Sequence, residues 1–441
     1  MSRCWSRTSL RPASPSKAVS GSVARHYTAF PYPRVVELQR EEPTGRIAGA
    51  LDWLLHRRGR RALSGRPLRI WVAGCGTRQA VQIALAFGGA DVIGTDVSGE
   101  SVRIARRLAR QLGLASVRFE RADLLDCRAT GAFDLIFCTG VLHHLEDPLS
   151  GLRTLERALA PDGAAVLMLY SRVHRLGFEH FRNGARAFRG GASGRAPDVR
   201  TTMTLLRAVL GSRCRPLLAE ELRGVGRERR RDLPTFADTL LHPHERHFDI
   251  DELMAFVRAG GFRFGSWARP ADWHPQRYFD SPRVHRQLAR LAPIDQWRVV
   301  YWLGARASPL FRFVVEKPAL PSPPPWRDEE IRRLAVVGLT ARTRYQVRDG
   351  RITRARPARV AWCARDVLRL RYEPFYGEET EVELPAGLSV TLGLARRGAT
   401  VAQLMERWAL PAAERVRFGI IRRLLPDQLG YLVPLGPPPG S

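Results

Sequence analysis

The chain has 441 residues, of which 44% are hydrophobic, so it is long enough for two or three domains with sizeable cores. No apolar run reaches the 18 residues of a membrane span, and the six cysteines form no C-x-x-C pair, which argues against a disulfide framework and a zinc site and favours the cytoplasm. The net charge is +28, but 69 of the 71 basic residues are arginine, a bias typical of a GC-rich genome that weakens the charge as evidence for a nucleic-acid partner.

The first 36 residues contain no acid, as in a mitochondrial transit peptide. Pro12 and Pro15, however, interrupt any amphipathic helix there. We therefore expect residues 1–25 to be a disordered leader, or the result of a start codon assigned too far upstream.

An apolar strand at 68–73 runs into a glycine turn at 74–77 and then into a helical pattern. A second strand, 91–95, ends in Asp96, 22 residues after Gly74. Glycines in such a turn let backbone N–H groups approach a ligand closely, and a carboxylate can accept hydrogen bonds from both hydroxyls of a ribose. The pair predicts a doubly wound α/β domain with a nucleoside-type cofactor at its strand ends. The glycines alone would also fit an ordinary βα turn.

Three more strands follow in the same rhythm. We expect the third at 119–123, ending in Asp123, the fourth at 133–145, almost wholly apolar and ending in polar groups, and the fifth at 164–170 after the turn 161–163. Between the second and third strands, four apolar residues share one helical face: Val102, Ala105, Ala109 and Leu112. Near-continuous apolar strands separated by helices indicate a parallel sheet covered on both faces.

These motifs together resemble the class I S-adenosylmethionine-dependent methyltransferases, over residues 26–317. The resemblance is carried by the turn Gly74-Cys75-Gly76-Thr77, by Asp96, by Ala122-Asp123-Leu124, by Gly140-Val141-Leu142-His143-His144-Leu145 with Asp147-Pro148, and by Asp162-Gly163. It implies a Rossmann-like, mostly parallel seven-stranded sheet and S-adenosylmethionine as the cofactor. The cofactor-binding positions that it implies are Gly74, Cys75, Gly76, Thr77, Asp96, Val97, Asp123, Leu124, Thr139 and Gly140.

His143 and His144 are the candidate catalytic residues, at the mouth of the fourth strand. Histidine titrates near neutral pH and could take the proton of an acceptor hydroxyl. Alternatively, one of the two packs or orients the loop. An acceptor amine or carboxylate would need no strong base.

Two positions depart from the pattern of the family. Val72 stands where many members carry an acid that holds the ammonium group of the methionine part. Arg78 stands where many have a third glycine, and it could pair with the cofactor carboxylate, crowd the pocket or point to solvent. The third glycine of a dinucleotide site is also absent, because that position is Gln79, and a dehydrogenase is therefore the poorer interpretation.

Residues 171–248 interrupt the α/β rhythm at a place that lies above the strand ends. We expect a lid and substrate-specificity element there, with a solvated insertion as the alternative. Its histidine-rich end, 242–247, has no two histidines four apart and contains Pro243, so we expect a polar loop facing the substrate and no metal site. Residues 27–33, aromatic between prolines, predict an extended segment that closes over the cofactor, as in related enzymes, or serves as a packing arm.

Asp249 predicts the N-cap of a helix that ends at Gly260-Gly261. Residues 262–268 and 311–316 predict a closing antiparallel pair, with helical residues 283–303 between them.

The prolines of 318–326 predict a linker, and residues 327–441 a smaller α+β domain. Its expected strands are 344–348, 381–384, 388–392 and 429–434, and its two helices have apolar faces made of Val401, Leu404, Met405 and Trp408, and of Val416, Ile420, Leu424 and Leu425. It loosely resembles a winged-helix module, which serves docking or dimerisation in methyltransferases or binds DNA.

Two motifs of DNA methyltransferases are missing from the sequence, which limits the possible classes of methyl acceptor. Residues 139–142 read Thr-Gly-Val-Leu, where DNA amino-methylating enzymes carry Asn/Asp-Pro-Pro-aromatic, and no Pro-Cys nucleophile for cytosine carbon occurs. We expect methyl transfer to an O or N nucleophile of a small molecule, such as a secondary metabolite, with no membrane partner. The alternatives are an RNA or protein held by the basic insertion and the C-terminal domain, and a catalytically weak cofactor-binding regulatory protein.

Overall fold

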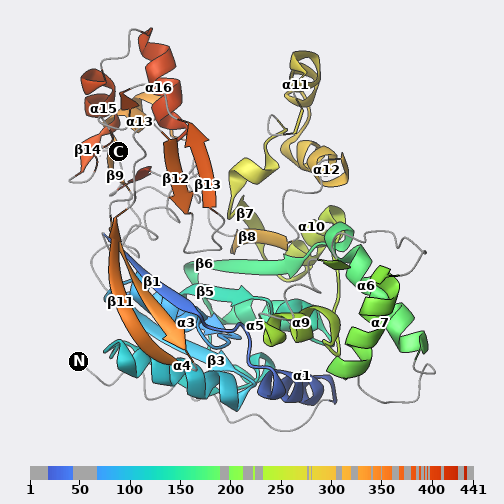
Figure 1. Ribbon diagram of the computed structural model, residues 1–441. Helices are drawn as coiled ribbons and strands as arrows, with labels where there is room; N and C mark the ends of the chain where they lie inside the picture. Colours follow the sequence, from blue (N-terminus) through green and yellow to red (C-terminus); the bar gives the residue numbers. More distant parts are fainter. Residues whose placement is uncertain are drawn as a thin grey trace.

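The fold was analysed in a computed structural model (Figure 1). The structure describes residues 18–42, 67–188, 198–211, 222–223, 232–275, 278–279, 281–303, 310–318, 326–338, 341–348, 350–359, 367–371, 379–383, 387–388, 392, 395, 398–408, 412–425 and 432–434. No helix in this part of the chain is long and apolar enough to cross a membrane.

A seven-stranded sheet with the order β4-β3-β2-β5-β6-β8-β7 forms the centre of the molecule. Its strands are β2 (Arg69–Ala73), β3 (Asp91–Asp96), β4 (Val117–Arg121), β5 (Phe133–Thr139), β6 (Leu159–Tyr170), β7 (Arg263–Trp267) and β8 (Leu310–Glu316). The first five are parallel, and β8 runs antiparallel to both β6 and β7. The expected doubly wound, mostly parallel sheet with its closing antiparallel pair is confirmed. The third strand lies two residues earlier than predicted, and the fifth begins five residues earlier. The fourth strand, predicted over 133–145, ends at Thr139, because Gly140 turns the chain into a short 3-10 helix, η2 (Leu142–His144).

Helices cover both faces of this sheet because successive side chains of a strand point to opposite sides. In β2, Val72 belongs to a first core cluster with residues of α3 (Gln79–Ala86) and α4 (Gly99–Gln111). Its neighbour Trp71 belongs to a second core cluster with residues of α5 (Pro148–Ala158) and α10 (Ile250–Ala259). The helical face predicted for 102–112 is confirmed, since Val102, Ala105 and Ala109 are buried in the first cluster and Leu112 packs against it.

The cap predicted at the start of α10 is present. The Asp249 side chain accepts the N–H of Glu252 at 2.8 Å, and the Glu252 side chain accepts the N–H of Asp249 at 2.9 Å, which is a capping box. Gly260 ends the helix, as expected. Between β7 and β8, the predicted helical stretch forms two helices, α11 (Pro282–Leu288) and α12 (Pro293–Leu303).

The insertion after β6 has a small core of its own. Its helices are α6 (Arg172–Phe188), α7 (Val199–Gly211) and α9 (Leu233–Leu240), which lie beside the sheet in Figure 1. Their buried residues, among them Phe181, Leu206 and Phe236, form one cluster, and Phe30 packs against it. The N-terminal segment therefore touches the insertion.

The expectation of a disordered leader at 1–25 is wrong for its second part. Residues 18–25 belong to α1 (Ala18–Ala29), whose residue Val23 is 9% exposed, and α1 packs on α4. The helix begins after Pro12 and Pro15, so these prolines do not interrupt it. Residues 1–17 lie outside the described part. The extended segment predicted at 27–33 begins only after Ala29, where α1 ends.

The C-terminal region contains a third hydrophobic cluster. Its elements are α13 (Asp328–Arg333), α15 (Val401–Arg407), α16 (Glu414–Arg422), and the antiparallel strands β14 (Ala399–Thr400), β9 (Ala335–Gly338) and β15 (Leu432–Pro434). A separate antiparallel pair is β12 (Val367–Arg371) with β13 (Glu379–Glu383). These elements confirm a small α+β arrangement, while the resemblance to a winged helix stays unconfirmed.

Two details of the C-terminal prediction are wrong. The predicted strand at 388–392 is absent from its described residues, because Leu388 and Leu392 are helical and fully buried. Val416, expected in the core face of the last helix, is 44% exposed, whereas Ile421 is buried. The rest of the predicted face is confirmed, since Leu424 and Leu425 belong to the cluster and Ile420 packs against it, while Phe418 and Ile421 take the place expected for Val416.

One hairpin of the C-terminal region packs against the central α/β domain. Strand β1 (Glu37–Glu42) pairs antiparallel with β10 (Ala341–Arg348), which pairs with β11 (Arg351–Arg359). Val347 is 6% exposed and belongs to the first core cluster, and the N–H of Ile352 donates to Gln111 Oε1 at 2.6 Å. Figure 1 shows β11 lying against α4. The predicted boundary at residue 327 therefore does not separate these elements in space.

Val347→Ala tests this integration. The substitution is expected to lower the free energy of unfolding by about 2 kcal/mol, because it removes buried methyl groups from a packed core. Val416→Ala is the matched control, since the same change at a 44% exposed valine should cost less than about 0.5 kcal/mol. Urea unfolding measures both, and equal effects would contradict the placement of β10 in the core.

Candidate active site

The glycine turn after β2 is held by close backbone packing. Gly74 has φ +68°, and a Cβ atom there would lie 2.1 Å from Val141 Cγ2. The N–H of Cys75 donates to the carbonyl of Thr95 at 2.8 Å, while the Cys75 side chain is buried in the first core cluster. Only the backbone of Gly74 and Cys75 is therefore available to a ligand, as a glycine turn that cradles a cofactor requires.

Asp96 binds the turn to the end of β3. Its carboxylate accepts the N–H of Gly76 at 2.9 Å and the N–H of Ser98 at 2.8 Å. Burial raises the pKa of Asp96, and these two hydrogen bonds oppose the rise. A carboxylate has about four acceptor sites, so two remain for ribose hydroxyls.

Asp123 follows the neighbouring strand end. The N–H of Ala122 donates to the Asp96 carbonyl at 3.0 Å, which brings the two predicted acids to adjacent strand ends. The Asp123 carboxylate accepts the N–H of Leu125 at 2.9 Å and so begins a single 3-10 turn, η1 (Leu124–Asp126).

The remaining predicted cofactor residues lie at the same edge of the sheet. The Val97 carbonyl accepts from Arg121 Nε at 3.2 Å, and Leu124 is buried in the second core cluster. Thr139 ends β5, and Gly140, with φ +76°, donates its N–H to the Met168 carbonyl of β6 at 3.4 Å. The structure thus brings all ten positions to the carboxyl ends of β2, β3, β4 and β5.

The segment after α1 crosses this turn. The carbonyl of Tyr32 accepts the N–H of Thr77 at 3.2 Å, and the carbonyl of Pro33 accepts the Thr77 hydroxyl at 2.5 Å. A Cβ on Gly76 would lie 2.7 Å from the Tyr32 oxygen, so the approach needs glycine. The Ser98 hydroxyl also donates to the Tyr27 carbonyl at 3.1 Å.

The two departures from the family pattern have different surroundings. Val72 is fully buried in the first core cluster, so its side chain is directed away from any ligand at the strand ends. Arg78 occupies the N-cap position of α3 without a side-chain cap bond. Burial and the negative charge of Asp238 raise the pKa of Tyr32, and the positive charge of Arg78 partly opposes this rise.

Both candidate catalytic histidines are buried at the mouth of β5. The His143 ring packs on Tyr170 at 3.8 Å between centroids, and neither of its ring nitrogens has a hydrogen-bond partner. The His144 Nδ1 lies 2.9 Å from the carbonyl of His244. Burial lowers the pKa of His143 well below its usual range and that of His144 to about 4. Both rings are therefore neutral at pH 7, and their catalytic role stays a prediction.

An acid from the insertion lies beside these histidines. Asp238 of α9 accepts the hydroxyl of Tyr27 at 2.8 Å and that of Tyr170 at 3.3 Å. Burial raises the pKa of Asp238 to about 6, although both hydrogen bonds oppose the rise. Arg175 of α6 lies over the Tyr170 ring at 3.9 Å.

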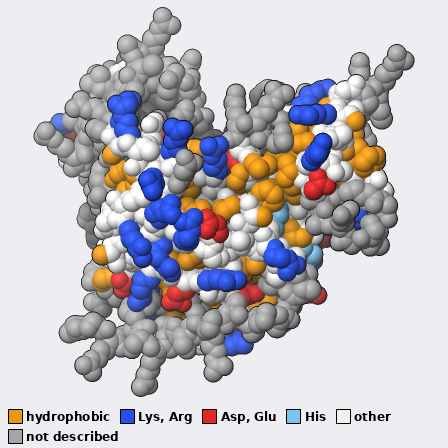
Figure 2. Space-filling model, turned by 60° about the horizontal axis from the view of Figure 1, so that its bottom comes forward, with side chains coloured by type: hydrophobic (Ala, Val, Ile, Leu, Met, Phe, Trp, Pro, Cys, Tyr) orange, Lys and Arg blue, Asp and Glu red, His pale blue; other side chains and the backbone are white. Residues whose placement is uncertain are grey.

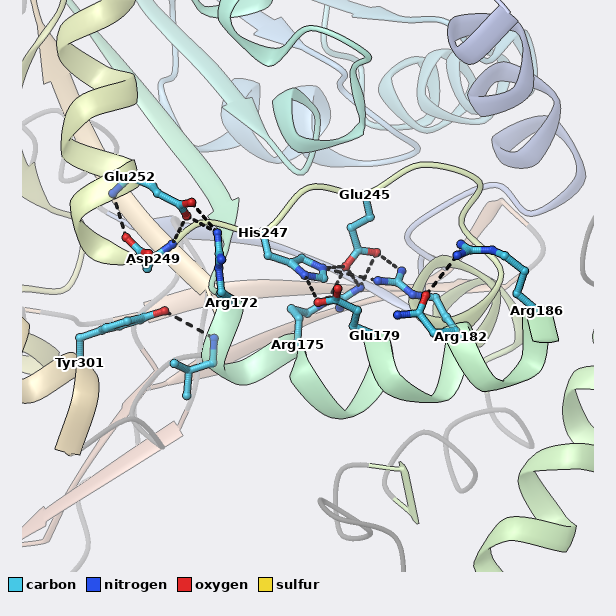
Figure 3. A network of polar contacts seen from close by, with 12 residues as sticks. Arg172, Arg175, Glu179, Arg182, Arg186, Glu245, His247, Asp249, Glu252 and Tyr301 are labelled. Atoms are coloured by element: carbon cyan, nitrogen blue, oxygen red, sulfur yellow. Dashed lines mark hydrogen bonds and ion pairs between the residues drawn. The ribbon is translucent and has the colours of Figure 1, made fainter. Parts of the chain in front are cut away.

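A second network joins α6 to the 241–248 loop (Figure 3). Glu245 receives two hydrogen bonds from Arg175, at 2.7 and 2.8 Å, one from Arg182, and one from His247 at 2.6 Å. Burial alone would raise the pKa of Glu245, but His247 and the two guanidinium groups outweigh it and hold that pKa well below its usual range. The His247 ring also contacts Glu179 at 3.0 Å. This charge network fixes the loop that covers His144.

Sequence reasoning missed Asp238, Tyr170 and Arg175. They come from a helix, a strand end and another helix, with no shared motif or spacing. Among the residues that the structure describes, no group of three histidine, cysteine or carboxylate side chains is arranged to hold a metal ion. The histidine-rich run 242–247 instead lies against the strand ends, where the N–H of Arg246 donates to the His143 carbonyl at 2.8 Å.

Comparison with known proteins indicates which reaction this edge of the sheet supports. Residues 72–209 match a family described as a methyltransferase domain. This match covers about a third of the chain and supports a methyltransferase domain there. The residues present fit S-adenosylmethionine, the cofactor expected from the sequence, because the turn offers bare backbone at two positive-φ glycines and Asp96 keeps free acceptor sites beside them.

Three relatives show how far the similarity extends. An uncharacterized protein of Synechococcus sp. is 28% identical over 97% of both chains. The ubiquinone biosynthesis O-methyltransferase of Ralstonia nicotianae is 32% identical over 127 residues, which are 28% of this chain and 49% of that protein, so the match spans about half of the relative. The structure of PKMT2 from Rickettsia typhi has a TM-score of 0.56 at 13% identity, over 91% of this chain and 76% of that one, which shows a common fold.

Asp238→Asn tests the buried acid. Because its pKa is raised in the folded state, the folded protein keeps a proton between pH 4 and 6 that the unfolded chain has lost, and stability falls as pH rises through this interval. Relative to wild type, the variant should therefore gain up to about 3 kcal/mol between pH 4 and 7 in denaturant unfolding. Asp198→Asn, at an exposed acid with a lowered pKa, should show the opposite sign and only below about pH 4, because that carboxylate loses its stabilising contacts as it is protonated. A difference for Asp238→Asn that does not change with pH would contradict the placement.

Proposed function

We propose that this methyltransferase acts on an O or N nucleophile of a small molecule, bound at the ends of β5 and β6. The enclosure of this place carries the proposal. His143, His144 and Tyr170 are at most 6% exposed, under the cover of α1 and the 241–248 loop. A site surrounded in this way suits an acceptor small enough to be enclosed.

The cofactor would be held by groups at four strand ends. The turn 74–77 would bind it through its backbone, Asp96 and Val97 at the ribose, and Asp123 and Leu124 at the adenine, with Thr139 and Gly140 near the methionine part. Arg78 would pair with the carboxylate, in place of contacts that Val72 cannot make. Bound S-adenosylmethionine supplies a methyl group made electrophilic by its sulfonium. The protein then mainly aligns the acceptor and, through His143 or His144, takes its proton.

The similarity to an O-methyltransferase of ubiquinone biosynthesis supports a small acceptor. That match covers only 28% of this chain, so it supports methyl transfer at the sheet edge and does not identify the acceptor. We infer that the insertion selects the acceptor, since it contributes Asp238, Arg175 and Glu245. We propose that the insertion 171–248 is the lid and specificity element, because it supplies the charged groups around the histidines.

Asp96→Ala tests the cofactor site. The variant should lose S-adenosylmethionine binding by at least about tenfold in calorimetry, because the carboxylate both binds ribose and fixes the turn through Gly76. Asp91→Ala, at the opposite end of the same strand, is the matched control and should bind normally. Normal binding by Asp96→Ala would overturn the assignment.

The acceptor is sought by transfer of labelled methyl groups from S-adenosylmethionine into a fractionated cell extract. Label in the low-molecular-weight fraction is the expected result. Cofactor binding without transfer into any fraction would instead favour the regulatory protein considered from the sequence.

A macromolecular acceptor is the second candidate, favoured by a basic face. Exposed arginines on α4 and β11, which pack together, include Arg106, Arg110, Arg351, Arg354 and Arg356. Figure 2, with the lower side of the molecule turned forward, shows Lys and Arg side chains gathered on one part of it. Such a face could hold RNA or an acidic protein through charge.

The triple variant Arg351→Ala, Arg354→Ala and Arg356→Ala separates the two candidates. With a small acceptor, methyl transfer should stay within about twofold of wild type, since these arginines are far in sequence from the site and exposed. Loss of transfer into an RNA or protein fraction, with binding that weakens steeply as salt rises, would establish the macromolecular acceptor.

A further inference from the structure

Two buried imidazoles, His144 and His242, stack on each other beside the strand ends. Their ring centroids are 3.6 Å apart at an angle of 27°, and the residues are 3% and 6% exposed. They come from different parts of the chain, one after β5 and one in the loop after α9. Each ring makes one hydrogen bond to the backbone of the same residue, His244, and these two bonds define where the ring protons lie.

The two rings must be opposite tautomers. His144 Nδ1 faces the carbonyl of His244 at 2.9 Å, and because a carbonyl only accepts, Nδ1 carries the proton and Nε2 has the lone pair. His242 Nδ1 accepts the backbone N–H of His244 at 3.2 Å, so it has the lone pair and Nε2 carries the proton. Burial lowers the pKa of His144 to about 4 and that of His242 well below its usual range, so both rings are neutral at pH 7.

Both Nε2 atoms are buried without a hydrogen-bond partner. Since both Nδ1 atoms face residue 244 and the rings are stacked, both Nε2 atoms lie on the ring edges directed away from that residue. One is a bare acceptor and the other a bare donor, side by side. A buried polar group without a partner lowers the stability of the fold by about 1–3 kcal/mol. A ligand that makes hydrogen bonds to both Nε2 atoms would remove this cost.

We propose that the stacked pair binds the hydroxyl group of a phenolic methyl acceptor, which donates to His144 Nε2 and accepts from His242 Nε2–H. The inference rests on the proposed function and narrows it from an O or N nucleophile to a hydroxyl. A hydroxyl oxygen is both donor and acceptor, as the pair demands. A carboxylate has no proton for His144, and an ammonium has no lone pair for His242.

The surroundings favour an aromatic acceptor. The rings of His26 and Tyr27, on α1, lie 5.0 and 5.5 Å from His242 between centroids, and Tyr27 lies 6.3 Å from His144. Flat rings on several sides suit a flat ring in offset or edge contact. A metal ion is disfavoured, because the only lone pair of His242 is used by the N–H of His244.

The pair also accounts for the proton. In the transfer step, the acceptor oxygen bonds to the methyl carbon while the carbon–sulfur bond breaks and sulfur keeps its electron pair. The hydroxyl proton passes to His144 Nε2, and the Nδ1–H bond to His244 holds that ring in place. The negative charge of Glu245 favours the resulting imidazolium. The products are an aryl methyl ether, S-adenosylhomocysteine and a proton released later to solvent.

Nitrogen NMR of the full-length protein labelled with [15N]histidine tests the tautomers without any turnover. Long-range 1H–15N spectra should show His144 protonated at Nδ1 and His242 at Nε2, with signals assigned from His144→Gln and His242→Gln. The same tautomer at both rings, or a charged ring at pH 7, would overturn the proposal.

Binding of simple probes tests the hydroxyl. With S-adenosylhomocysteine present, phenol should shift both Nε2 signals, whereas anisole and aniline should not, because neither offers a hydroxyl. His242→Gln should weaken phenol binding about tenfold, and leave S-adenosylhomocysteine affinity unchanged. His180→Gln, at an exposed histidine of α6, is the matched control. No response to phenol, or an equal response to all three probes, would refute the assignment. Failure to bind S-adenosylhomocysteine would instead count against the proposed function, and the tautomer spectra would still decide the state of the pair.

Discussion

The carboxylate of Asp96 holds the site together. It accepts N–H groups from the turn after β2 and from the start of α4, and thereby fixes two strand ends against each other. The turn has little freedom to move otherwise, since Val141 packs against Gly74 on one side and the Tyr32 carbonyl against Gly76 on the other. The backbone at this edge of the sheet is therefore held rigidly in place. The side chains that pack over this edge supply its chemical groups.

Buried polar groups from three separate segments of the chain pack over this edge of the sheet. α1 brings Tyr27, the insertion brings Asp238, and the loop before α10 brings Glu245. Glu245 is balanced by Arg175 and Arg182, whereas Asp238 has mainly tyrosine hydroxyls as partners and is correspondingly easier to protonate. Burial keeps the neighbouring histidines neutral, so the site combines fixed charges at its rim with uncharged imidazoles at its centre.

A strand from the N-terminal region pairs with a hairpin from the C-terminal region beside the first core cluster. β1, just after the segment that crosses the glycine turn, pairs with β10, and β10 and β11 also contact the first core cluster and α4. The segment at the active site is therefore anchored through β1 to a hairpin from the C-terminal region.

The sequence by itself determined the parallel strands, the strand ends that carry the expected cofactor positions, and the cap at Asp249. Continuous apolar runs and local hydrogen bonds depend on neighbouring residues, so the sequence reveals them directly. It also placed His143 and His144 at a strand end, since a strand carries its sequence directly to the sheet edge. Only the tertiary structure decided that His242 stacks on His144, that Asp238 joins Tyr27 to Tyr170, and that Val347 lies in the first core cluster. The contacts of Asp238 with Tyr170 and Tyr27 join residues 68 and 211 positions apart, and no local pattern specifies which distant side chain fills a given space. Val416 shows the same limit, since helical spacing defines a face but the packing partner decides which face is buried.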